Sequence, residues 1–86
     1  MSDVIEIPVK EELDRHFSAL IDSCGLIEGY VAGNYGNQPI VANAENKATV
    51  ERNTGHLKYM RDKPWWTGYD MTRVNAAITA GDAYSA

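Results

Sequence analysis

The chain has 86 residues, which is enough for one small domain. Its 12 acidic and eight basic side chains give a formal net charge of −4, so it lacks the strongly basic balance typical of nucleic-acid-binding proteins. Val, Ile, Leu and Phe together number 17, near the lower limit for a chain that folds around its own core, and a partner or self-association is expected to add stability. The single Cys excludes an intramolecular disulfide, and no leader or membrane-spanning apolar run is recognisable, so an aqueous compartment is expected.

An extended N-terminal arm is expected over residues 1–8, because Pro8 biases the residue before it toward extended backbone geometry. Val4, Ile5 and Ile7 give this arm apolar side chains. They would cover the chain's own core or add a strand to a neighbouring chain.

The first helix is predicted over residues 9–24, where apolar side chains recur on one arc. That arc contains Val9, Leu13, Phe17, Leu20 and Cys24, with Ile21 at its edge. Gly25 is expected to take the left-handed position that ends the helix. A long glycine-rich loop is then expected over 25–43, with a short hairpin around Gly33 and Asn34 as the alternative.

A second helix is predicted over residues 44–62, with Asn43 as its cap. Its apolar stripe is Val50, Leu57 and Met60, and its opposite side is small, with Ala44, Ala48 and Gly55. A glycine inside a helix costs about 1 kcal/mol relative to alanine. We therefore expect either close approach of another backbone at Gly55 or a break in the helix there.

Pro64 must interrupt this helix, and a third helix is predicted over residues 68–82. Thr67 followed by Asp70 has the spacing of a capping box. Val74 and Ile78 would face inward with Met71, and a second, small face is formed by Ala76, Ala80 and Ala83. Helices 44–62 and 68–82 should pair as an antiparallel hairpin.

The sequence therefore predicts one all-α domain. Residues 1–8 form its arm, 9–43 its acidic helix and loop, and 44–86 its helical hairpin.

Catalytic groups are sparse. Glu12 and His16 are four residues apart, which predicts a solvated ion pair rather than a metal or acid–base site. Cys24 lies on the apolar arc and is expected to be a buried structural thiol rather than a nucleophile. No phosphate-binding glycine loop and no serine nucleophile elbow is present. We expect a non-enzymatic protein without metal, cofactor or small-molecule substrate.

Basic and aromatic residues suggest two kinds of contact. Lys47, Lys58 and Arg61 lie along one flank of helix 44–62 and would serve single-stranded nucleic acid in an alternative interpretation. The favoured interpretation is that they face acidic residues of helix 9–24 or of a neighbouring subunit. Trp65 and Trp66 would either close the end of the helical hairpin or, with Tyr69, anchor an interface. At most one of the two tryptophans should be fully buried.

Residues 50–84 carry a resemblance to a family. The matching positions are Val50-Glu51-Arg52-Asn53, His56-Leu57, Met60, Trp66-Thr67, Asp70-Met71, Ala76-Ala77-Ile78, Ala80-Gly81 and Ala83-Tyr84. This stretch resembles the C-terminal part of small proteins from tailed bacteriophages. The resemblance implies a structural protein of the virion, such as a head decoration, adaptor or connector-associated component, with other virion proteins and copies of itself as partners.

The expected contact residues are the apolar residues of the arm and the exposed aromatics, namely Val4, Ile5, Ile7, Tyr30, Tyr35, Trp65, Trp66 and Tyr69. The alternative function is a small helical regulator that binds nucleic acid or a host protein.

Overall fold

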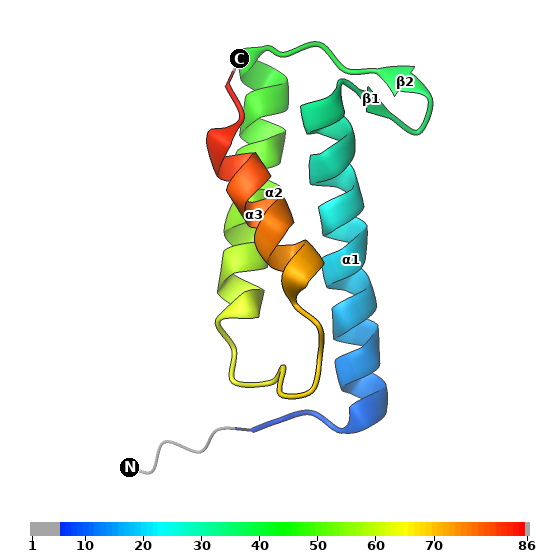
Figure 1. Cartoon of the computed structure of the whole chain (residues 1–86), viewed down its shortest axis with the longest axis vertical. Coiled ribbons are helices and arrows are strands. Elements are labelled where there is room, and N and C mark those ends of the chain that lie inside the picture. The colour runs from blue at the N-terminus through cyan, green and yellow to red at the C-terminus, as the bar shows by residue number, and fades with distance from the viewer. Residues whose placement is uncertain (1–5, 86) are drawn as a thin grey trace.

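The computed structural model describes residues 6–85, which form a bundle of three α-helices with a small β-hairpin after the first (Figure 1). The elements are α1 (Lys10–Ala32), β1 (Asn34–Tyr35), β2 (Gln38–Pro39), α2 (Ala44–Arg61) and α3 (Thr72–Ala83). α2 runs antiparallel to α1, and α3 returns antiparallel to α2 and packs on both (Figure 1). The predicted all-α class, the three-helix arrangement and the helical hairpin are confirmed.

The core lies between the three helices along most of their length. Its buried apolar side chains are Leu13, Leu20, Cys24 and Ile27 of α1, Val50 and Leu57 of α2, Trp66 of the α2–α3 loop, and Val74, Ala77 and Ile78 of α3. Leu13, Leu20 and Cys24 belong to the arc predicted for the first helix. The arc continues with Ile27, which the sequence pattern had placed in a loop.

α1 is longer than predicted, and the expected end at Gly25 is wrong. The helix continues to Ala32, and Gly33 takes the left-handed position with φ 81°. Continuing the helix brings Ile27 into the core, where it is completely buried. Complete burial of such a side chain contributes about 1.5–3 kcal/mol, which offsets the combined cost of about 2 kcal/mol for the helical glycines Gly25 and Gly29. The Tyr30 ring, packed against the core, adds to the gain. The predicted loop 25–43 is therefore reduced to the connection between α1 and α2.

That connection contains the hairpin that the sequence suggested only as an alternative. Tyr35 pairs with Gln38 and Asn34 with Pro39, and the turn is formed by Gly36 and Asn37 rather than by Gly33 and Asn34. Both turn residues have positive φ, 56° and 66°, as the favoured two-residue hairpin turn requires.

α2 has the predicted extent and cap. The side-chain oxygen of Asn43 accepts a hydrogen bond from the Asn46 backbone N–H at 2.8 Å. The helix is not broken at Gly55, but no other backbone approaches there either, since an added Cβ would meet nothing within 4 Å. The close approach occurs instead at Gly81 of α3, where an added Cβ would overlap the Thr54 hydroxyl.

α3 begins later than predicted, and the capping box at Thr67 is wrong. Gly68 has φ 89°, which a right-handed helix does not allow. The first helical residue is Thr72, whose backbone N–H donates to the Asp70 carboxylate at 3.0 Å. The small residues that α3 buries are Ala77 and Gly81, whereas Ala76 and Ala83 of the predicted small face are exposed.

Candidate protein-interaction surfaces

The predicted contact residues lie at two ends of the bundle rather than on one surface. Ile7 and the loop with Trp65, Trp66 and Tyr69 lie near the first turn of α1, whereas Tyr30 and Tyr35 lie at its last turn and the hairpin (Figure 1). The 23-residue helix α1 separates these ends by about 34 Å. Val4 and Ile5, also predicted, lie outside the described residues.

Trp66 is part of the core and closes the end of the helical hairpin. It is 8% exposed, and its indole N–H donates to the Met60 carbonyl at 2.8 Å. Its ring meets Phe17 at a centroid distance of 6.0 Å and Tyr69 edge-on at 5.4 Å. The expectation that at most one of the two tryptophans is fully buried is confirmed.

Trp65 is only half buried, and apolar and aromatic side chains surround it at the surface. Its indole N–H donates to the Glu6 carbonyl at 3.2 Å, which holds the segment containing Ile7 against the loop. The Lys63 ammonium lies 5.3 Å from the Trp65 ring and 4.5 Å from the ring of Tyr59, a residue 64% exposed. We call Ile7, Tyr59, Lys63 and Trp65 the loop-end patch.

Tyr69 and Asp14 fasten the α2–α3 loop to the first turns of α1. The Tyr69 hydroxyl donates to the Asp14 carboxylate at 2.6 Å, and the Lys10 ammonium donates to both Asp14 oxygens at 2.8 and 3.0 Å. The hydrogen bonds from Lys10 and Tyr69 lower the pKa of Asp14, while the hydrogen bond to Asp14 raises the pKa of Tyr69. The Tyr69 hydroxyl is therefore already hydrogen-bonded within this chain.

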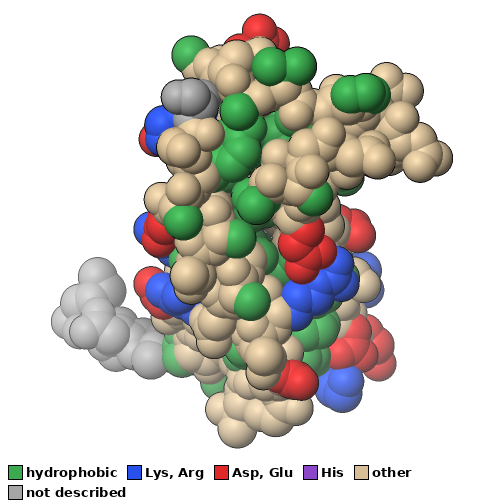
Figure 2. All heavy atoms as spheres, turned by 45° about the horizontal axis from the view of Figure 1, so that its top comes forward, with side chains coloured by type: hydrophobic (Ala, Val, Ile, Leu, Met, Phe, Trp, Pro, Cys, Tyr) green, Lys and Arg blue, Asp and Glu red, His purple; other side chains and the backbone are tan. Residues whose placement is uncertain are grey.

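At the opposite end of the molecule, the connection between α1 and α2 forms an exposed, uncharged surface. Between Glu28 and Glu45 the sequence contains no Lys, Arg, Asp or Glu. Val31, Tyr35 and Val41 are exposed there, Val41 to 67%. In Figure 2 the projecting hairpin shows backbone, uncharged polar and apolar surface only. The neutral hairpin surface is defined as Val31, Asn34, Tyr35, Asn37, Gln38 and Val41.

Sequence reasoning identified Tyr30 and Tyr35 in this region but missed Val31 and Val41. The absence of charge between Glu28 and Glu45 is a signal that would have found them. Depletion of charged residues and enrichment of tyrosine are typical of interface cores.

The basic flank of α2 is paired with carboxylates, but not with those of α1. Lys58 lies 2.8 Å from Asp82 of α3. The other two bases pair locally, Lys47 with Glu51 at 3.7 Å and Arg61 with Asp62 at 3.1 Å. The expectation that these bases face acidic residues of the first helix is wrong, and contact with a neighbouring subunit stays a prediction.

The acidic first helix pairs instead with α3. Arg73 donates to both oxygens of Glu28 at 2.7 and 3.0 Å and lowers the pKa of that carboxyl. A fork-to-fork arrangement of this kind is geometrically specific. It fixes α3 against α1.

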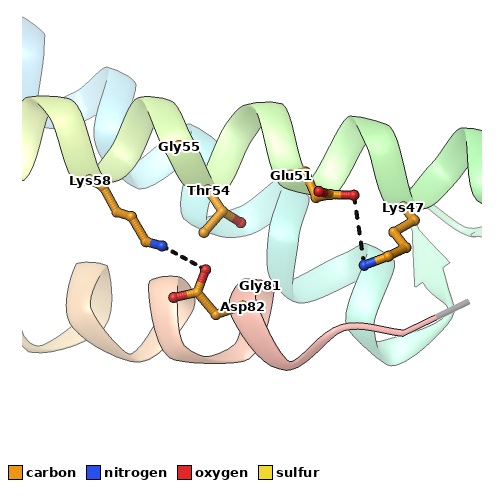
Figure 3. Close-up of a pocket in the computed structure, with 7 residues that line it drawn as sticks. All are labelled: Lys47, Glu51, Thr54, Gly55, Lys58, Gly81 and Asp82. Carbon is orange, nitrogen blue, oxygen red and sulfur yellow. Dashed lines mark hydrogen bonds and ion pairs between the residues drawn. The ribbon is translucent and has the colours of Figure 1, made fainter.

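A shallow pocket of about 240 Å³ opens between α2 and α3 (Figure 3). Its lining is Lys47, Glu51, Thr54, Gly55, Lys58, Gly81 and Asp82. Both ammonium groups are paired with carboxylates of the same lining, and neither a histidine nor a thiol contributes to it. The pocket therefore presents matched charges and neither an imidazole nor a thiol.

Cys24 is a buried structural thiol, as predicted. It has no exposed surface, burial raises the pKa of its thiol, and its sulfur lies 3.9 Å from the Arg73 carbonyl oxygen.

The His16 ring packs on Trp65 at a centroid distance of 5.2 Å, and within residues 6–85 no ion pair joins it to Glu12. The same residues contain no group of three or more His, Cys, Asp and Glu placed to hold a metal ion.

No helix in the described part of the chain has the length and apolar character needed to cross a bilayer. Comparison of the chain with protein-family models, curated proteins and solved structures gives no match.

Proposed function

We propose that this protein is a non-enzymatic structural component of a bacteriophage particle, which connects neighbouring proteins through the two ends of its bundle. The observation that carries the proposal is the presence of two separate surfaces with exposed apolar and aromatic side chains, the loop-end patch and the neutral hairpin surface, at opposite ends of one bundle. A spacer with a contact surface at each end suits an adaptor or decoration protein.

The internal packing supports separate contact surfaces at fixed positions. Trp66 closes the bundle, the Asp14–Tyr69 hydrogen bond fastens the loop to α1, and the Glu28–Arg73 pair joins α1 to α3. Each surface is small, so a single contact would be weak. A particle that presents many copies compensates through multivalency, since linked weak contacts add up to a much higher avidity.

The assignment to a phage particle rests on the resemblance of residues 50–84 to small tailed-phage proteins. In this fold that stretch spans most of α2, the closing loop and α3. It contains the core residues of α2, the loop and α3, together with Tyr59, Lys63 and Trp65 of the loop-end patch, whereas the neutral hairpin surface lies outside it. The choice of partner would then depend on the hairpin end and on residue Ile7.

The direct test is quantitative mass spectrometry of purified particles of the phage that encodes the chain. The expected result is a fixed copy number per particle that survives density-gradient purification. Cosedimentation of the purified protein with particles that lack it gives a second measurement. An exposed charge in the neutral hairpin surface, Val41→Glu, should weaken this binding, whereas the matched change Ala76→Glu on the outer side of α3 should not.

Absence from purified particles, together with no cosedimentation, would contradict the proposed location. Equal binding by the two variants would contradict a role of the hairpin end.

A further inference from the structure

We infer that the neutral hairpin surface is the site at which two copies of this chain associate about a twofold axis. The inference rests on the proposal that the protein acts through contacts, and it assigns a partner to one of the two ends. It concerns the isolated protein, so it can be tested without phage particles.

The first argument is electrostatic. The chain carries a net charge of −4, and the outer face of α1 exposes Glu11, Glu12 and Asp22. A twofold interface uses the same surface of both subunits, so a charge near the axis meets its own copy. Like charges placed together across an interface are strongly unfavourable. The stretch between Glu28 and Glu45 carries no charge, so hairpin residues that meet their own copies bring no like charges together.

The second argument is chemical self-complementarity. A lysine-rich surface fits an acidic one and not itself, whereas an amide or a phenol both donates and accepts hydrogen bonds. The neutral hairpin surface combines the amides of Asn34, Asn37 and Gln38 with the phenol of Tyr35. The exposed Val31 and Val41 add apolar area that requires no particular polar partner. Such a surface can pair with a second copy of itself.

The third argument is preorganisation. An added Cβ at Gly29 would lie 2.7 Å from the Tyr35 ring, so the hairpin packs directly on the α1 backbone at this glycine. The Tyr30 ring lies against Tyr35 at 5.8 Å, and the Ile40 backbone N–H donates to the Gly33 carbonyl at 2.9 Å. A surface that is already ordered loses less entropy when it binds.

The hairpin register indicates side-chain contact rather than strand addition at the edge of β2. Gly33 and Ile40 form a hydrogen-bonded pair, so the next pair, Asn34 and Pro39, directs its backbone groups outward. Proline has no N–H, and the outer edge of β2 therefore lacks a donor at this position. A second hairpin therefore cannot add a regular ladder at the edge of β2, and contact at this edge is left to the side chains.

The test is sedimentation equilibrium of the full chain over concentrations from about 10 µM to 1 mM, because a surface smaller than a standard interface predicts weak association. Two double variants, Gln38→Glu/Val41→Glu and Gln38→Lys/Val41→Lys, place charge on the surface. The expected average mass of the wild type rises toward that of a dimer. Each variant alone should dissociate at least about tenfold more readily.

The decisive measurement is the equimolar mixture of the two variants. Each homodimer brings together only like charges, whereas the mixed dimer brings together only opposite ones, so mixing should restore association. Ala76→Glu and Ala76→Lys, at an exposed position of α3, serve as matched controls and should each associate like the wild type. Far-ultraviolet circular dichroism confirms that every variant keeps its helical content.

A wild type that stays monomeric up to about 1 mM would overturn the inference, as would double variants that associate normally or a mixture that fails to recover. Binding of phage particles by such a monomeric protein would refute the twofold contact alone and leave the proposed function standing.

Discussion

The crossing of α2 and α3 gives a sharp test of the packing, because two helical glycines there have opposite surroundings. A Cβ added at Gly81 would overlap the Thr54 hydroxyl and come within 3.1 Å of Thr54 Cβ and 3.2 Å of its Cγ2. Rotating the Thr54 side chain therefore does not create the space. A Cβ added at Gly55 would meet no atom within 4 Å.

The magnitude follows from two competing effects. Replacing a helical glycine by alanine gains about 1 kcal/mol of helix propensity. Overpacking a well-packed contact costs about 1–3 kcal/mol, and the value for Gly81 should be near the upper end because three Thr54 atoms are involved. Gly81→Ala should thus lower the free energy of unfolding by about 2 kcal/mol, and Gly55→Ala should raise it by about 1 kcal/mol.

The assay is thermal and urea unfolding of both variants followed by circular dichroism. For a domain of this size 1 kcal/mol corresponds to roughly 4–8 °C in Tm, so the two variants should differ by more than about 10 °C. The double variant Thr54→Ala/Gly81→Ala should recover part of the loss, because truncation of Thr54 removes the overlapping hydroxyl and Cγ2. A Gly81→Ala protein as stable as Gly55→Ala would refute this account of the helix crossing.

Three further outcomes are expected. In the folded state the pKa of Asp14 lies below its ordinary value of 3.8, so its pairing stabilises the fold above that pH. This stabilisation is lost as the pH falls through the lower, folded-state pKa. Asp14→Asn should remove this part of the pH dependence of the free energy of unfolding, measured by urea titration between about pH 2 and 6. The buried Cys24 thiol should react with a thiol reagent only as fast as the chain opens, and a reaction at the rate of a free thiol in native buffer would contradict its burial. Since Lys47, Lys58 and Arg61 are paired with carboxylates, the protein should not be retained on single-stranded DNA at about 0.15 M salt. If the protein is retained, and neutralising these three residues abolishes the retention, they bind nucleic acid and the expectation is wrong.

The candidate contact surfaces were only partly predictable from the sequence. The exposure of Tyr35 and Ile7 could be predicted because aromatic and apolar side chains in a turn and an arm have few internal partners. Trp66 resembled them in sequence but lies in the core, since the loop folds back over Phe17. Val31 and Val41 were missed because a short apolar residue has no signature until its neighbours in space are known. The exposure of all these residues depends on how the loop and hairpin pack.

Local sequence features were enough to predict the helical character of the chain, the apolar arc through Leu13, Leu20 and Cys24, and the start of α2 at its Asn43 cap. These features depend on interactions within a few residues, such as side-chain periodicity and a cap hydrogen bond. The three-dimensional packing determines that α1 passes through Gly25, because burial of Ile27 in the core outweighs the local preference of a glycine to end a helix. It also decided that Gly81 rather than Gly55 meets another helix, since the point at which two helices cross depends on packing between segments far apart in the chain.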